Sequence, residues 1–309
     1  MNNNNFIKLL NINTLVISGG GMKGYLFFGS IKLLFELDIL NKIKYYYGTS
    51  FGGIIVTCLI LDWNYEELIK FSTNFPIDCL IKMNLESIIE NYGLIPQKNL
   101  EIIIKKIITF KNYDENITFK ELFDLTSKEL NLISFSLKYN KIVCLNYKNT
   151  PNLKIWEGIY MTAALPMLIP LYEYNNDYFI DGGISENFAI NMIKDNLLHT
   201  IGIAIDTYNT DWETLKDYIE NKNIINYLKY LSELINIFIS KTKFSNIENT
   251  IKLSFKNFNN SEQFNFLLDK NKKNDIINSG YNQSLIQINK IINTLSKEQI
   301  KIYKSKYFF

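Results

Sequence analysis

The chain has few cysteines, and their spacing argues against two common kinds of crosslinked site. The three cysteines are Cys58, Cys79 and Cys144. The number is odd, the intervals are wide and no Cys-x-x-Cys pair occurs, which argues against a disulfide framework and against a zinc site. We therefore expect free thiols and a reducing compartment.

The sequence also lacks an excess of charge and a long apolar run. Its formal net charge is +2, so there is no electrostatic reason to expect nucleic acid as a partner. No uninterrupted apolar stretch reaches about 18 residues and no signal peptide is recognisable, so we expect no transmembrane helix. The prediction is a cytoplasmic protein that contacts membranes only peripherally. Hydrophobic residues, at 47%, suffice for a large core.

The first part of the chain alternates strand and helix patterns. A short apolar run at 14–18, bounded by glycine, predicts a buried strand, and 22–38 predicts a helix. A second strand ends in the sequence YYYGTS at 45–50, and another apolar helix follows at 52–63. This alternation predicts a parallel sheet covered on both sides.

The rest of the chain changes character at about residue 208. Helices are expected over most of 64–130, with a Thr-x-x-Glu capping box at Thr118 and Glu121, and a hairpin over 131–147. From 208 to 309 the chain is rich in Lys and Asn and shows an apolar helical stripe at 224–240. We expect a catalytic domain at 14–207 and a helical C-terminal region packed on it.

The first glycine turn, GGGMKG at 19–24, fits the pattern G-x-G-x-x-G between a strand and a helix. That context is the one a dinucleotide-binding fingerprint requires. Such a site also needs an acid at the end of the next strand, and that strand runs into Gly48-Thr49-Ser50 instead. A turn needed only for close packing is the other alternative.

The second glycine turn has the pattern of a nucleophile elbow. Gly48-x-Ser50-x-Gly52 fits G-x-S-x-G, again between a strand and a helix. The flanking glycines leave room for a cramped turn that exposes the Ser50 hydroxyl. The helix behind it would direct backbone N–H groups at a reacting oxygen.

A serine nucleophile needs a base, and three residues are candidates. Asp181 ends a strand before Gly182-Gly183, although Asp-Gly is also a common turn pair. His199 precedes the strand TIGIAI, at the amino end, whereas sites in parallel sheets lie beyond the carboxyl ends. We therefore favour Asp181, with Asp206 as the second choice.

These three turns, in this order and spacing, resemble the patatin-like phospholipases. The segment WEGIYMTAALPMLIPLYEY at 156–174 is also similar to that family, and the resemblance covers roughly 14–207. It implies a three-layer α/β/α fold with a mainly parallel central sheet, to which this chain adds a helical C-terminal extension. It also implies a Ser50–Asp181 dyad with no histidine, metal or cofactor in the chemistry. The oxyanion hole would consist of the first turn, Gly19, Gly20, Gly21, Met22, Lys23 and Gly24.

Two positions depart from the family pattern. Lys23 stands where many members carry arginine, so it lacks the bidentate fork for phosphate and could equally be a solvated residue at a helix start. Ala189 stands where relatives often have proline after the Asp-Gly-Gly turn. We expect little effect from Ala189.

The resemblance predicts a serine hydrolase that cleaves carboxylic esters of phospholipids or lysophospholipids, of the phospholipase A type. The helices within 64–110 and the stripe at 224–240 would line an acyl channel, rest on a membrane or simply pack in the core. A protein activator is a further expected partner. The alternatives are a non-catalytic lipid-binding or partner-regulated protein on the same fold, and a dinucleotide-dependent oxidoreductase.

Overall fold

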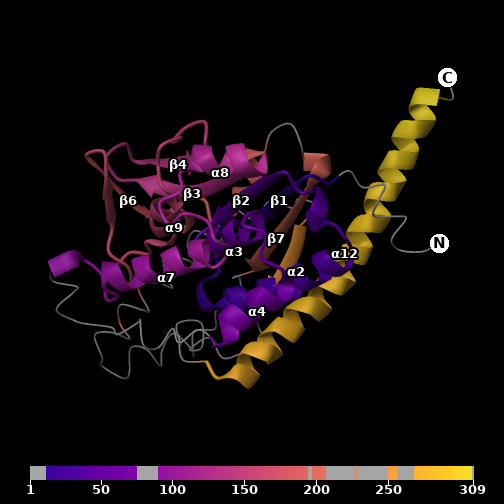
Figure 1. The fold of residues 1–309 in the computed structure, drawn as a ribbon. Coiled ribbons are helices and arrows are strands. Elements are labelled where there is room, and N and C mark those ends of the chain that lie inside the picture. The colour runs from indigo at the N-terminus through magenta and orange to yellow at the C-terminus, as the bar shows by residue number, and fades with distance from the viewer. Residues whose placement is uncertain are drawn as a thin grey trace.

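The computed structural model describes residues 12–74, 90–193, 197–206, 227, 231, 250–255 and 268–307. In this part of the chain, an eight-stranded mixed sheet lies at the centre and helices pack against it (Figure 1). The strands are β1 (Thr14–Ile17), β2 (Tyr45–Thr49), β3 (Glu129–Ser136), β4 (Lys141–Leu145), β5 (Tyr172–Tyr174), β6 (Asp177–Asp181), β7 (Thr200–Asp206) and β8 (Thr250–Ser254). The α-helices are α2 (Tyr25–Glu36), α3 (Phe51–Ile60), α4 (Tyr65–Asn74), α7 (Gln97–Thr109), α8 (Phe119–Thr126), α9 (Ile155–Ala163) and α12 (Lys270–Tyr307). Short 3-10 turns are η1 (Gly21–Gly24), η2 (Leu40–Lys42), η3 (Gly182–Ile184), η4 (Ala189–Met192) and η5 (Leu197–His199).

The sheet is parallel at its centre and antiparallel at one side. Its order is β5-β6-β3-β2-β1-β7-β8, and β4 also pairs with β3. The pairs among β3, β2, β1, β7 and β8 are parallel, while β4, β5 and β6 join by antiparallel pairing. The central strands are almost wholly buried, as expected when both faces of a parallel sheet are covered.

The two faces of the sheet are covered by different layers. Helices α2, α3 and α9 contribute to the large core on one face, together with side chains such as Leu15 and Ile203. The segment 188–193, which contains η4, packs on the other face around Val16 and Ile133. The predicted α/β fold with a mainly parallel central sheet is therefore confirmed.

Strands β2 and β6 lie end to end along the same edge of β3. β2 pairs with β3 from Glu129 to Ile133, and β6 pairs with it from Ser134 to Ser136. β4 pairs with 132–136 of β3 and so occupies the other edge. Because β2 is parallel to β3 and β6 is antiparallel to it, the carboxyl ends of β2 and β6 face each other.

The C-terminal region contains a strand as well as a helix. Residues 250–254, which we expected to be helix, form β8 and extend the sheet beside β7. Helix α12 then packs along α2 (Figure 1). The predicted stripe at 224–240 lies outside the described residues, apart from two positions. The division of the chain at residue 208 stays a prediction.

Local signals in the first part of the chain are confirmed. The 131–147 hairpin is β3 and β4, joined by a turn at 137–140. Helix α8 begins with the predicted capping box, in which the Glu121 N–H donates to Thr118 Oγ1 and the Glu121 carboxylate accepts from the Thr118 N–H. The predicted helix at 22–38 begins instead as η1 and continues as α2.

Candidate active site

Ser50 occupies a tight turn between β2 and α3. Its backbone has φ 54° and ψ −126°, a left-handed conformation that is unfavourable for a residue with a side chain. The close approach behind it explains one glycine, because a Cβ on Gly52 would lie 2.4 Å from the Ser18 carbonyl oxygen. Gly48, in β2, likewise faces the backbone of Gly53. The turn therefore has the geometry of the predicted nucleophile elbow.

Asp181 lies beside Ser50. The Ser50 side chain lowers the pKa of the Asp181 carboxyl, and the Gly183 N–H donates to Asp181 Oδ1 at 2.7 Å. Only 2% of Asp181 is exposed, and this burial raises its pKa from 3.8 to about 6, although these two interactions act in the opposite direction. A carboxylate with this pKa is ionised at neutral pH and still has appreciable affinity for a proton.

The structure brings these two residues together in a way that the sequence argument did not anticipate. Our expectation treated Asp181 as the carboxyl end of a strand in a parallel sheet. β6 is in fact antiparallel to β3, and Asp181 pairs with Ser134, one step beyond the pairing of Thr49 with Ile133. Ser50 and Asp181 meet because their strands approach along one edge from opposite directions.

The first glycine turn lies directly beside Ser50. A Cβ added to Gly19 would be 3.2 Å from the Cβ of Ser50. The Gly19 N–H already donates to the Asn187 carbonyl at 3.0 Å, so Gly19 does not fit the donor role that we expected for it. Gly20 and Gly21 lie at the N-terminal end of η1, where backbone N–H groups have no acceptor within the turn.

The other residues of the first turn are buried. Met22, Lys23 and Gly24 lie inside η1, and a Cβ on Gly24 would overlap the ring of Phe51, the residue after Ser50. Lys23 is only 6% exposed, so the alternative of a solvated side chain at a helix start is wrong. Its expected help to an oxyanion or a phosphate stays a prediction.

Glu186 and Asn187, which follow the Asp-Gly-Gly turn, connect the three glycine turns. The sequence analysis missed both residues. The Thr49 hydroxyl donates to the Glu186 carbonyl at 3.3 Å. Asn187 binds Gly19 twice, because its carbonyl accepts from the Gly19 N–H and its Nδ2 donates to the Gly19 carbonyl at 3.4 Å. The chain after Asp181 thereby ties the ends of β1 and β2 together.

Thr162, at the C-terminal end of α9, is a third residue that the sequence analysis missed. The Ser50 N–H donates to its hydroxyl at 3.0 Å. Thr162 lies in the segment that resembles the family, but its partner is 112 positions away, so no local pattern indicates the contact.

His199 lies at the opposite end of the sheet. It is the last residue of η5, directly before β7, and its carbonyl accepts from the Asn13 N–H next to the start of β1. Seven residues of β7 separate it from the end where Asp206 lies, about 20 Å at the usual rise per residue. Asp206 is at the carboxyl end, but β7 is two strands away from β2. Ser50, by contrast, lies close enough to Asp181 for its side chain to lower the pKa of the Asp181 carboxyl.

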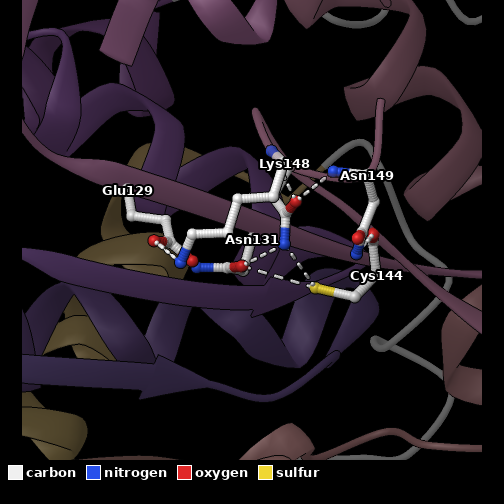
Figure 2. A network of polar contacts seen from close by, with 6 residues as sticks. Glu129, Asn131, Cys144, Lys148 and Asn149 are labelled. Carbon is white, nitrogen blue, oxygen red and sulfur yellow. Dashed lines mark hydrogen bonds and ion pairs between the residues drawn. The ribbon is translucent and has the colours of Figure 1, made fainter. Parts of the chain in front are cut away.

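A separate polar network lies around the start of β3 and the end of β4 (Figure 2). Asn131 Oδ1 accepts from Asn146 Nδ2 at 2.9 Å, and Lys148 forms an ion pair with Glu129 at 2.8 Å. Burial raises the pKa of the Cys144 thiol to about 12, so this cysteine stays protonated. The charges here neutralise each other, which indicates a structural role.

The described residues contain neither a metal-binding cluster nor a bilayer-spanning helix. No group of three or more histidine, cysteine or acidic side chains in this part of the chain could hold a metal ion. Within the same residues, no helix has both the length and the apolar character of a bilayer-spanning segment.

Sequence comparison identifies the family. The model described as patatin-like phospholipase matches residues 15–193. The uncharacterized protein R571 of Acanthamoeba polyphaga mimivirus is 29% identical over 289 residues, 91% of this chain and 95% of that protein. The probable lipid hydrolase 463L of Invertebrate iridescent virus 6 is 32% identical over 58% of this chain and 62% of its own length. For triacylglycerol lipase 5 of Saccharomyces cerevisiae the values are 24% identity, 63% of this chain and 30% of the lipase.

Solved structures share the fold at low identity. VipD from Legionella pneumophila has a TM-score of 0.54 at 13% identity, over 90% of this chain and 67% of VipD. The type III effector ExoU has a TM-score of 0.50 at 15% identity, over 91% of this chain and 53% of ExoU. The family model alone covers more than half of the residues, and it includes all three glycine turns. The chain therefore belongs to the patatin-like phospholipase family.

Proposed function

We propose that this protein hydrolyses carboxylic esters of phospholipids or lysophospholipids, as a serine hydrolase of the phospholipase A type with a Ser50–Asp181 dyad. One observation carries the proposal: a buried carboxylate lies beside a serine that is held on a strained turn, close enough for the serine side chain to lower the pKa of the carboxyl. Membership of a family of lipid hydrolases supports the coarser assignment. Two relatives are named a probable lipid hydrolase and a triacylglycerol lipase, which also supports an ester of a lipid as the substrate.

The proposed reaction begins with attack by Ser50. Asp181 takes the hydroxyl proton as the oxygen bonds to the ester carbonyl carbon, and the backbone N–H groups of Gly20 and Gly21 stabilise the negative oxygen of the tetrahedral intermediate. As the ester C–O bond breaks, the leaving alcohol takes the proton from Asp181. A water molecule then attacks the acyl-enzyme, with Asp181 again accepting the proton. The bond between Ser50 Oγ and the acyl carbon breaks, Ser50 takes the proton back from Asp181, and free fatty acid is released.

Burial gives Asp181 the property that this role requires. A general base works best when its pKa is close to the working pH, because it is then ionised and still binds a proton well. An ordinary aspartate is a weak base, whereas the raised pKa of about 6 makes Asp181 a better one. No histidine is needed in this scheme.

The alternatives receive less support from the same geometry. The first glycine turn packs against Ser50, and its first N–H is bound to Asn187, which leaves less of the turn to hold a pyrophosphate. For a non-catalytic lipid-binding protein there is no comparable reason to bury an ionisable carboxylate against a serine, since that burial costs free energy. Partner regulation on the same fold stays an alternative.

We also propose that the β3–β4 turn contacts membranes peripherally. Leu137, Tyr139 and Tyr178 are exposed there, and the amino groups of Lys138 and Lys141 lie 5.5 and 5.3 Å from the centre of the Tyr139 ring. Exposed aromatic and aliphatic side chains beside lysines suit the surface of an anionic bilayer. The turn follows the carboxyl end of β3. Because β2 and β3 are parallel, this turn and Ser50 lie at the same end of the sheet.

A protein activator is a further proposal, with one supporting fact. The structural relative ExoU was solved in a heterodimeric complex with SpcU, at a TM-score of 0.52 and 14% identity to this chain. Ester hydrolysis by the purified protein alone would show that no activator is required.

The substrate proposal is tested by mass spectrometry of products from mixed phospholipids. We expect the wild-type protein to release free fatty acids and lysophospholipids, and Ser50→Ala to release neither. If the wild type cleaves triacylglycerols and leaves phospholipids intact, the phospholipase assignment is wrong while the dyad stands. Release of a phosphorylated head group would instead contradict acyl hydrolysis.

A further inference from the structure

The C-terminal end of α9 reaches both members of the proposed dyad. Thr162 Oγ1 accepts a hydrogen bond from the Ser50 N–H at 3.0 Å. Two residues later, the carbonyl of Ala164 accepts from the Asp181 N–H at 2.9 Å. Thr162 and Ala164 are both fully buried. One short segment therefore holds the backbone on each side of the Ser50–Asp181 contact.

Thr162 also bridges the gap between β2 and β3. The strands pair as far as Thr49 and Ile133, where the chain turns away at Ser50. The Thr162 hydroxyl donates to the Ile133 carbonyl at 2.5 Å while it accepts from the Ser50 N–H. A hydroxyl group has one donor and two acceptor positions, so it makes both bonds at once. The side chain thus continues the hydrogen-bond ladder by one step, past the end of the strand.

We propose that Thr162 is a positioning residue for the reaction described above, and this inference rests on that proposed function. By holding the Ser50 N–H, it fixes the left-handed backbone conformation from which the hydroxyl reaches Asp181. It acts through Ser50 and does not contact the Asp181 carboxylate. Because the Ser50 N–H is bound to Thr162, this amide is not a donor to the oxyanion, which leaves that role to the glycine turn.

Substitutions can remove the hydroxyl group and the methyl group of Thr162 separately. Its methyl group packs at the start of α3, where a Cβ on Gly53 would lie 2.9 Å from Thr162 Cγ2. Thr162→Val keeps the shape and loses the hydroxyl, whereas Thr162→Ser keeps the hydroxyl and loses the methyl. If Thr162→Val does not fold, Thr162→Ala can be compared with Thr162→Ser instead, because these two variants differ only by the hydroxyl group.

The first test is steady-state ester hydrolysis by these variants. Misplacing a reacting group by about 1 Å costs on the order of a hundredfold in rate. For Thr162→Val, and for Thr162→Ala relative to Thr162→Ser, we expect kcat to fall about 10- to 100-fold while KM changes by less than about twofold. Thr162→Ser should retain kcat within about threefold. Equal losses in the serine and valine variants would overturn the proposal, because packing would then be the cause.

The second test does not depend on activity. Hydrogen exchange of the Ser50 amide, followed by NMR, should be slow in the wild type and in Thr162→Ser, and faster by at least about tenfold in Thr162→Val. If the wild type hydrolyses no ester, the proposed function fails, and this measurement still decides whether Thr162 holds the Ser50 backbone. Unchanged exchange in Thr162→Val would overturn the inference, as would a wild-type kcat in that variant.

Discussion

At the residue scale, the contact between Ser50 and Asp181 depends on neighbours that supply little chemistry of their own. Gly52 allows the backbone of β1 to approach the turn, and Asn187 ties Gly19 to the chain after Asp181. Burial then makes the pKa of Asp181 higher than that of a free aspartate. The consequence is a carboxyl group that titrates just below neutral pH, and it leads to two predictions.

The first prediction concerns the pH dependence of activity. Because Asp181 accepts a proton only when it is ionised, kcat/KM should fall tenfold per pH unit below an apparent pKa near 6. The measurement is a profile of kcat/KM between pH 4.5 and 8.5 on a neutral ester. A profile with its acid limb near pH 4 would show that Asp181 is not the titrating base.

The second prediction concerns stability. The pKa of Asp181 is raised to about 6 in the folded chain, so ionisation of this group opposes folding progressively as pH rises from about 4 to about 6. Asp181→Asn removes that cost and keeps one carbonyl oxygen that can accept from the Gly183 N–H. We expect the variant to be more stable than the wild type at pH 8, by on the order of 3 kcal/mol, and little different at pH 3.5.

Thermal unfolding at the two pH values measures this difference. Asp177 provides the control, because it is also buried but accepts hydrogen bonds from Ser136 and from two backbone N–H groups. Asp177→Asn should not be more stable than the wild type at pH 8. A less stable Asp181→Asn at pH 8 would contradict our account of this carboxylate.

At the element scale, the helices, strands and turns that depend on local sequence patterns were predicted correctly. The strand before the first glycine turn, the β3–β4 hairpin and the capping box of Thr118 and Glu121 depend on residues close in the chain, and all are confirmed. The antiparallel direction of β6 and the existence of β8 were missed, because both depend on pairing with strands far away in sequence. Thr162 and Asn187 were missed for the same reason.

Close contact between α2 and α12 gives a prediction at this scale. A Cβ on Gly280 would lie 2.1 Å from the carbonyl oxygen of Leu26, and Ser30 and Ser284 share a hydrogen bond across the same contact. Alanine normally favours a helix by about 1 kcal/mol over glycine. We nevertheless expect Gly280→Ala to destabilise the fold by about 1–3 kcal/mol, because the backbones would have to separate.

Chemical denaturation of Gly280→Ala measures this loss. Asn278, which is exposed on the same helix, supplies the control variant Asn278→Ala, and its stability should change little. If Gly280→Ala is as stable as the control, the two helices do not pack as closely as described.

At the scale of the whole molecule, the proposed Ser50–Asp181 dyad and an exposed lysine-aromatic turn lie at the same end of the sheet. The β3–β4 turn is held firmly, since buried Asp177 accepts hydrogen bonds from the Lys138 and Tyr178 N–H groups. Tyr139, which lies in this turn, is 60% exposed. A rigid turn of this kind is suited to resting on a bilayer near the site where a lipid ester would react.

Vesicle binding tests this arrangement. We expect Tyr139→Ser combined with Lys141→Gln to reduce sedimentation with vesicles containing anionic phospholipids by about fivefold or more. Hydrolysis of a water-soluble short-chain ester should remain unchanged. Leu125, exposed on α8, gives the control Leu125→Ser, which should bind vesicles like the wild type. Equal binding by the turn variant and this control would refute the proposed contact.

The central claim is that Ser50 and Asp181 react as a pair without histidine. The most direct measurement is the initial rate of short-chain ester hydrolysis by purified wild type, Ser50→Ala, Asp181→Asn and His199→Ala, each shown to be folded by circular dichroism. We predict a loss of at least about a thousandfold for the first two variants and a change within about twofold for His199→Ala. A folded but inactive His199→Ala, or an active Asp181→Asn, would contradict the claim.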